Sequence, residues 1–339
     1  MEAEVVDGRA VVAVKAEGAA EADDDGRNIM LRVFFTTLVI FFIAGSVPTA
    51  TFADQGQASQ TVFKSPEEAM KALVDAVQAD DKQKMLNILG SEGKDAISSG
   101  DEVADMNNRA KFVKSYQDKV NFVKEADRVS IIIGKDDYPM AIPLVKKGEG
   151  WVFNTKEGLQ ELLRRRIGRN ELSSINSCYS YMRAQREYGS VDRTMEGIMQ
   201  YAQKFCSTPG KRDGLYWEVT EGEQPSPLGA SYAAAAGEGY KSGEVCFFSP
   251  VPYHGYIYKI LTGQGASAPG GAYNYVINGR MVGGFALVVW PAQYGVSGVM
   301  TFIVNQNGIV FEKNLGPGTD KIARAMTEYN PDATWSRAQ

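Results

Sequence analysis

The sequence Asn305-Gln306-Asn307-Gly308 separates two β-rich runs, residues 301–304 and 309–312. An Asn-Gly pair between two such runs is the strongest short-range signal for a β-hairpin. We therefore expect antiparallel strands here, and further short strands at residues 256–261, 273–277 and 285–289. Because residues 207–300 are rich in glycine, proline and serine, the expected sheet is irregular.

The first third of the chain has a helical pattern. Ser65-Pro66-Glu67-Glu68 combines an N-cap serine, a proline at the first helical position and glutamates in the first turn, which predicts a helix start. Two more helices are expected, one after Asp81 and one over residues 103–120. Strands follow at 129–133, 138–145 and 151–153, and Asn154 caps a further helix. Helices before a meandering antiparallel sheet are typical of an α+β fold.

Gly168 is expected to interrupt this last helix. Glycine costs about 1 kcal/mol against alanine inside a helix, so we predict a helix end near Ile167 and a new helix from Asn170 to Tyr188. In the new helix an inward apolar stripe is expected at Leu172, Ile175, Tyr179 and Met182. The predicted organisation is a leader (1–53), a linker (54–64), an N-terminal α+β domain (65–168) and a C-terminal α+β domain (169–339).

An uncharged, mostly apolar run extends from Val33 to Val47, and small residues lead to Ala53 just before Asp54. This is the pattern of a secretory signal peptide, and we expect cleavage before Asp54. The acidic stretch before the run is unlike the start of a signal peptide, so translation is expected to begin at Met30. The alternative is an uncleaved membrane anchor, although the run is short for a span of roughly 20 residues.

Charge argues against nucleic acid as a partner. The formal net charge is −5, but residues 1–53 hold eight acidic and four basic side chains, so the rest of the chain is nearly neutral. A phosphate-backbone binder needs clustered positive charge. Even Arg164-Arg165-Arg166 lies without a surrounding basic field, and Arg165 has Glu161 one helical turn before it.

The chain has one histidine, His254, which excludes zinc sites built on two or three histidines. No metal or cofactor is expected. A hydrolase could use His254 as a general base with a carboxylate that sequence spacing does not place. The alternative is a loop histidine that hydrogen-bonds to the backbone.

Aromatic residues are concentrated in the C-terminal half, with ten of them at positions 247–294. Flat rings with polar tips could line a groove for saccharide or peptide. The alternative is that they form the core of a small sheet, and the residue types favour that alternative. The candidate ligand-binding residues are Tyr253, His254, Tyr256, Tyr258, Tyr273, Tyr275 and Trp290.

The three cysteines all lie in the part expected to be exported, where one disulfide can form. Cys178 falls on an apolar helix face and is expected to be a buried free thiol. Cys206 and Cys246 are therefore the predicted pair.

Several long stretches resemble domain-of-unknown-function family 2950, a bacterial family of uncharacterised exported proteins. The resemblance covers about residues 63–335. It is carried by RRRIGRNEL, AQREY, DGLYW, PYHGYIYKILTGQG, APGGAYNY, GFALVVWPAQYG and SGVMTFIVNQNGIVFEKNLG. It implies export and brings neither an activity nor functional residues.

Two further resemblances concern the fold. The start of the N-terminal domain, AMKALVDAVQADDKQKMLNIL, resembles small α+β domains of the nuclear-transport-factor type. The helix from Asn170 together with the hairpin TFIVNQNGIV is similar to the head regions of type IV pilin-like and pseudopilin proteins, in which a helix packs on an antiparallel sheet. Pilins begin with a long apolar assembly helix, whereas the corresponding helix here lies mid-chain.

The sequence thus predicts an exported, periplasmic or secreted cell-envelope protein that binds or scaffolds without catalysis. Its partner would be an envelope protein or a glycan. The alternative function is an envelope hydrolase acting on saccharide or peptide through His254. Membrane association is expected only if the run from Val33 to Val47 is retained as an anchor.

Overall fold

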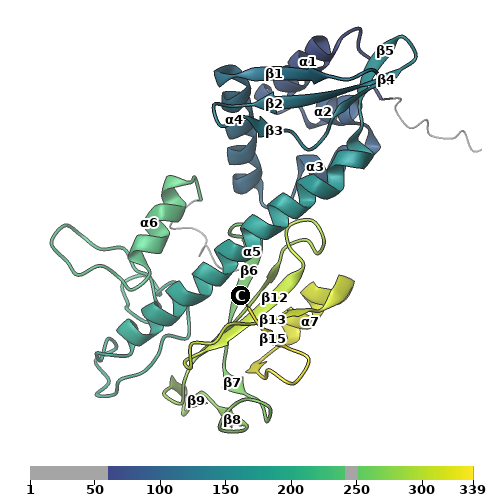
Figure 1. Ribbon diagram of the computed structural model, residues 1–339. Helices are drawn as coiled ribbons and strands as arrows, with labels where there is room; N and C mark the ends of the chain where they lie inside the picture. Colours follow the sequence, from purple (N-terminus) through teal and green to yellow (C-terminus); the bar gives the residue numbers. More distant parts are fainter. Residues whose placement is uncertain (1–59, 241–250, 339) are drawn as a thin grey trace, which may run out of the picture. The chain divides into compact units, whose positions relative to one another are not determined.

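A computed structural model describes residues 60–240 and 251–338, which belong to one compact unit. The predicted leader, most of the predicted linker and Cys246 lie outside the described residues. Helices and antiparallel sheets alternate along the described chain, which confirms the predicted α+β fold (Figure 1).

The N-terminal part begins with a group of short helices. Ser65 caps α1 as predicted, because its Oγ accepts a hydrogen bond from the backbone N–H of Glu68 at 3.1 Å. The apolar face of α1 is buried in a hydrophobic core, with Ala69 and Met70 fully shielded from solvent. The helices are α1 (Pro66–Gln78), α2 (Lys82–Leu89), η1 (Ser91–Gly93), α3 (Lys94–Ile97) and α4 (Glu102–Asp118).

The first sheet covers this helical group. In β2, Val129, Ile131 and Ile133 alternate inward and share the core with α1 and α2. The helix expected at residues 103–120 ends at Asp118, because the next residues pair with β2 as an edge strand. The strands are β1 (Val120–Lys124), β2 (Arg128–Ile133), β3 (Tyr138–Pro139), β4 (Leu144–Lys147) and β5 (Gly150–Phe153), in the order β1-β2-β4-β5 with β3 beside β2.

A single helix, α5 (Thr155–Tyr188), runs through the position where a break was predicted (Figure 1). The predicted helix end near Ile167 is therefore wrong. Tertiary contacts on both sides outweigh the small intrinsic cost of Gly168. Arg166 donates to the carbonyls of Asp95 and Ala96, and Glu171 accepts from the N–H groups of Val299 and Met300.

The buried face of α5 also differs from the predicted stripe. Met182 is buried and Ile175 partly buried, but Leu172 is 61% and Tyr179 40% exposed. The inward face instead includes a tyrosine and several small or polar residues: Ser174, Cys178, Tyr181, Ala184 and Gln185. Helix α5 packs on the second sheet with this face. The division into domains at residues 168–169 stays a prediction.

The second sheet lies against the C-terminal half of α5. The predicted hairpin is confirmed: β12 and β13 are antiparallel, and the N–H of Gly308 donates to the carbonyl of Asn305 at 3.0 Å. The central strand β11 is buried along its whole length. The strands are β6 (Tyr256–Leu261), β11 (Ala286–Pro291), β12 (Met300–Asn305), β13 (Phe311–Asn314) and β15 (Ser336–Arg337), in the order β15-β13-β12-β11-β6.

Short elements complete the second core. The strand expected at residues 273–277 is two separate two-residue strands, β8 and β9. Helix α6 in the alanine-rich stretch was not predicted. The remaining elements are α6 (Gly229–Gly237), β7 (Gly263–Gln264), β8 (Tyr273–Asn274), β9 (Val276–Ile277), β10 (Arg280–Met281), η2 (Gly316–Gly318), α7 (Thr319–Ala325) and β14 (Glu328–Tyr329). Of the helices in the described ranges, none is long and apolar enough to cross a bilayer.

Candidate functional site

The candidate aromatic residues divide into buried and accessible groups. Tyr256, Tyr258, Tyr275 and Trp290 are at most 2% exposed and belong to the second core. These four rings therefore fill a core, the arrangement that the sequence favoured over a groove. Tyr273 is 40% exposed, and Tyr253 and His254 are half-buried.

His254 has the carboxylate partner that sequence spacing did not place. Its Nε2 lies 2.9 Å from Oε2 of Glu238, in the turn that follows α6. The two side chains are 30% and 42% exposed, so the pair remains open to solvent. The backbone of His254 has a φ of +50°, a left-handed conformation that is uncommon for residues other than glycine.

A buried carboxylate, Asp101, holds the loop that carries His254. Its Oδ2 accepts hydrogen bonds from the Tyr240 hydroxyl and from the backbone N–H of Gly255, both at 2.8 Å. Its Oδ1 accepts from the N–H of Ala104 and so caps α4. The side chain is almost completely buried, and its three donors supply the hydrogen bonds that a buried carboxylate requires.

The aromatic rings around His254 are held as neutral hydrogen-bonding groups. The Tyr253 ring meets the imidazole edge-on at 4.2 Å between centroids, and the Tyr240 ring lies at 6.1 Å. Burial, reinforced by the charge of Asp101, raises the pKa of Tyr240 well above its usual range. Burial and the charge of Glu238 raise the pKa of Tyr253 to about 12. Both phenols stay protonated at neutral pH and cannot serve as bases.

The contacts of His254 within the described residues hold its side chain and its loop in place. In the described part of the chain, the hydrogen-bonding partners of His254 are Glu238 on the side chain and Tyr240 on the backbone. A nucleophile activated by the imidazole would have to lie within hydrogen-bond reach of it. The residues in contact with the imidazole offer a carboxylate and phenols instead. Across the described ranges, no cluster of three acidic, histidine or cysteine side chains is arranged to hold a metal ion.

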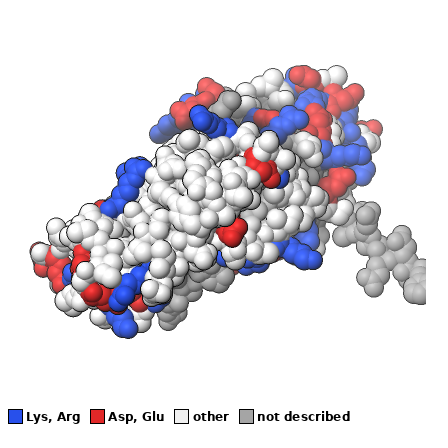
Figure 2. Space-filling view, turned by 90° about the horizontal axis from the view of Figure 1, so that it is seen from below, with Lys and Arg blue, Asp and Glu red and all other residues white. Residues whose placement is uncertain are grey.

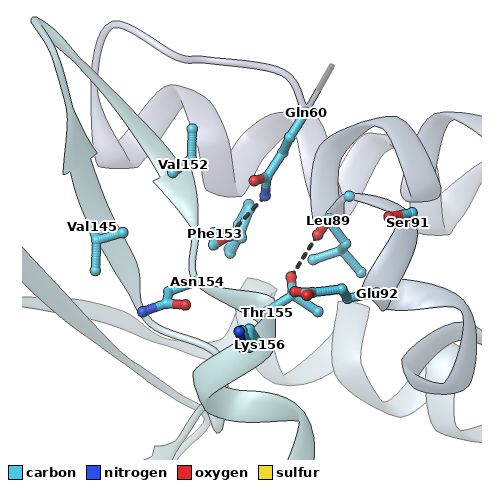
Figure 3. Close-up of a pocket in the computed structure, with 11 residues that line it drawn as sticks. Gln60, Leu89, Ser91, Glu92, Val145, Val152, Phe153, Asn154, Thr155 and Lys156 are labelled. Atoms are coloured by element: carbon cyan, nitrogen blue, oxygen red, sulfur yellow. Dashed lines mark hydrogen bonds between the residues drawn. The ribbon is translucent and has the colours of Figure 1, made fainter. Parts of the chain in front are cut away.

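A hollow of about 300 Å³ lies in the N-terminal part, beside the start of α5 (Figure 3). Several of its polar groups hold its own walls together. Gln60 Nε2 donates to the carbonyls of Ile88 and Phe153, and Thr155 Oγ1 donates to the carbonyl of Leu89 at 2.7 Å. Because these bonds join the chain segments around the hollow, we assign them a structural role.

A second cavity, of about 190 Å³, lies between α5 and α6. Of the candidate ligand-binding tyrosines, the half-buried Tyr253 lines it, and so does an edge of the core residue Tyr258, which is 1% exposed. Sequence reasoning identified these tyrosines and missed the polar residues of α5 that share the cavity with them, Ser173, Asn176, Ser177 and Ser180. Their spacing places them on one side of the helix, which could have suggested a polar wall.

Much of the surface is uncharged. Between Thr262 and Phe311 the only charged residue is Arg280, and it pairs with Glu196 at 2.8 Å. Seen from below the view of Figure 1, a broad area with few lysine, arginine or acidic side chains faces the viewer (Figure 2). Such a surface suits an uncharged partner.

The predicted disulfide involves a residue outside the described ranges. Cys178 is a fully buried free thiol, as expected, and burial raises its pKa well above its ordinary value. The pairing of Cys206 with Cys246 stays a prediction, since Cys246 lies outside the described residues.

The fold and the site together describe an α+β protein in which a long helix joins two hydrophobic cores and a half-buried histidine is held by a buried carboxylate. A family model for a protein of unknown function, DUF2950, matches residues 60–338. The chain belongs to this family, which confirms the resemblance seen in the sequence. No curated protein and no solved structure matches the chain. The resemblances to pilin-like heads and to nuclear-transport-factor domains therefore stay predictions.

Proposed function

We propose that the chain is an exported, non-enzymatic binding module of the cell envelope. The proposal rests on the structural role of the polar groups around His254. Asp101, Tyr240 and the backbone of His254 are engaged in hydrogen bonds that hold the loop 253–255, and in the described part of the chain no serine, threonine or cysteine side chain is hydrogen-bonded to the imidazole.

An uncharged glycan of the envelope is the partner class that we favour over an envelope protein. The surface contributed by residues 262–284 carries one charge, which is internally paired, and it exposes the ring of Tyr273. An aromatic ring beside uncharged polar side chains can stack on the C–H face of a sugar. An acidic protein or a nucleic acid would find little opposite charge here.

Binding to isolated envelope glycan tests this proposal. The purified chain should co-sediment with insoluble peptidoglycan, and Tyr273→Ala should weaken retention several-fold. Tyr179→Ala is the matched control, because Tyr179 is also 40% exposed but lies on α5. Equal retention of both variants, or no retention of the wild type, would contradict the proposal.

The second candidate function is an envelope hydrolase acting on saccharide or peptide. It is favoured by the 2.9 Å contact between His254 Nε2 and Glu238 Oε2, since a carboxylate partner orients an imidazole base. Turnover of glycan and peptide substrates by the wild type, lost in His254→Ala, would establish this function and overturn the binding-only proposal.

Export is part of the same proposal. It rests on the run from Val33 to Val47 and the small residues before Asp54. Mass spectrometry of the protein from its native host should give a mature N-terminus at Asp54. An N-terminus before Val33 would instead show that the run is retained as an anchor.

A further inference from the structure

The cavity between α5 and α6 is lined by two chemically different groups of side chains. One is formed by short hydroxyl and amide side chains of α5, among them Ser173, Asn176 and Ser177. The other is aromatic: Tyr253 is half-buried, whereas Tyr181, itself on α5, and Tyr258 are 2% and 1% exposed. Polar side chains and aromatic residues thus line one space of about 190 Å³.

Hydrogen-bonding capacity remains open on the polar side. Within the described residues, the side chains of Ser173, Asn176 and Ser231 form no hydrogen bonds with the protein, although all three line the cavity. The amide of Asn176 alone offers two donors and one acceptor. A ligand that carries several hydroxyl groups would satisfy these atoms in a way that an apolar ligand cannot.

The lining also restricts the charge of the ligand. Every described lining residue is uncharged, so a carboxylate or ammonium placed here would lose hydration without gaining an opposite charge.

The volume of the cavity restricts the size of the ligand as well. A cavity of about 190 Å³ is smaller than the roughly 300–1,000 Å³ typical of sites for drug-sized ligands, and this favours a single ring over an oligomer.

We propose that this cavity binds one neutral sugar residue, with the C–H face of the ring against Tyr253 and its hydroxyls toward Ser173 and Asn176. The assignment rests on the proposed binding function and names the ligand class for it. It also gives the polar residues of α5 a role that is separate from the exposed Tyr273.

A matched pair of probes tests the chemistry. D-Glucose and D-glucuronate differ by a carboxylate at one carbon, and both can be titrated into the full chain by isothermal calorimetry, alongside N-acetyl-D-glucosamine. We expect a neutral sugar to bind and glucuronate to bind at least tenfold more weakly. The assignment fails if neither neutral sugar binds, or if glucuronate binds as well as glucose.

Variants locate the site. Asn176→Ala should weaken neutral-sugar binding about fivefold, the effect of one neutral hydrogen bond, and Ser173→Trp should abolish it by filling the cavity. Asn121→Ala is the control, an exposed asparagine on β1, and should leave binding unchanged. Circular dichroism verifies that each variant is folded. Unchanged binding in folded Ser173→Trp would overturn the assignment.

The outcomes separate this proposal from the wider one. If the chain is retained on peptidoglycan through Tyr273 but Ser173→Trp binds glucose like the wild type, envelope binding stands and the cavity assignment falls. If glucose binds in the cavity but envelope material does not retain the chain, the cavity assignment stands and envelope binding falls.

Discussion

The carboxylate of Asp101 accepts a hydrogen bond at 2.8 Å from the backbone N–H of Gly255, which lies 154 residues further along the chain. One residue begins α4, in the N-terminal part, and the other follows His254. The same carboxylate oxygen also accepts from Tyr240. A single buried side chain thus ties the start of a helix to the loop that presents the histidine.

Removing this carboxylate should destabilise the protein strongly. Asp101→Ala leaves the Tyr240 hydroxyl and the N–H groups of Ala104 and Gly255 without their acceptor. Because hydrogen bonds to charged groups contribute about 1.5–3 kcal/mol each, we expect a loss of about 3 kcal/mol or more in the free energy of unfolding, measured by urea denaturation. Asp75→Ala removes an exposed carboxylate paired with Lys71 and should cost less than about 1 kcal/mol. Similar losses in the two variants would contradict the role given to Asp101.

The carboxylate of Asp213 should make the stability of the folded protein depend on pH in the acid range. Partial burial acts to raise the pKa of Asp213, but hydrogen bonds from Lys204 and Thr208 outweigh burial and lower the pKa to about 2. The folded-state pKa lies below the ordinary value of about 4. The carboxylate therefore stabilises the fold above about pH 4, and this contribution is lost as the pH falls toward 2.

Asp213→Asn tests this directly. The variant should melt below the wild type at pH 7, and the difference between their melting temperatures should shrink as the pH falls from 4 to 2.5. Thermal melts followed by circular dichroism at these pH values give the melting temperatures of the variant and of the wild type. A difference that stays constant with pH would show that Asp213 acts without its charge.

Whether a feature could be predicted from the sequence depended on how far apart along the chain its interacting residues lie. The start of α1 and the β12–β13 hairpin were predicted correctly, because a cap and a turn involve residues a few positions apart. The Asp101–Gly255 contact could not be predicted, since the fold alone brings these residues together. The pairing of Glu238 with His254 escaped for the same reason.

The continuity of α5 shows a different limit. Gly168 carries a weak local preference against helix, and a preference of about 1 kcal/mol decides little when both neighbouring segments are anchored. The anchors, Arg166 on one side and Glu171 on the other, look like surface residues in the sequence. The candidate aromatic residues were ambiguous because tyrosine occurs in cores and grooves alike.

The number of reactive thiols tests the predicted cysteine pairing. Cys178 is fully buried, and burial keeps its thiol protonated, so native protein should not react with iodoacetamide. If Cys206 pairs with Cys246, denaturation without reductant should expose one thiol per chain, and reduction should raise this to three. Mass spectrometry counts the carbamidomethyl groups. Three reactive thiols before reduction would contradict the pairing.

Two arginines on α5, Arg164 and Arg166, lie in different surroundings. Arg166 is buried, and its guanidinium donates to the carbonyls of Asp95 at 2.6 Å and Ala96 at 2.9 Å, in the short helix α3. Burial lowers the pKa of Arg166, which shows that desolvation opposes its charge. Arg164 is 77% exposed on the side chain, and Glu161 lies 3.9 Å away.

Arg166→Ala should therefore lower the free energy of unfolding by about 2–4 kcal/mol, because two carbonyls lose charged donors and the space left behind is buried. Arg164→Ala should change it by less than about 0.5 kcal/mol. Urea denaturation of both variants gives the comparison. If the two were equal, the anchoring of α5 on α3 would contribute nothing, and the continuity of the helix through Gly168 would need another cause. A large difference would show that Arg166 is a structural anchor whereas Arg164 is a solvated surface charge, so the adjacent arginines do not act as a single basic patch.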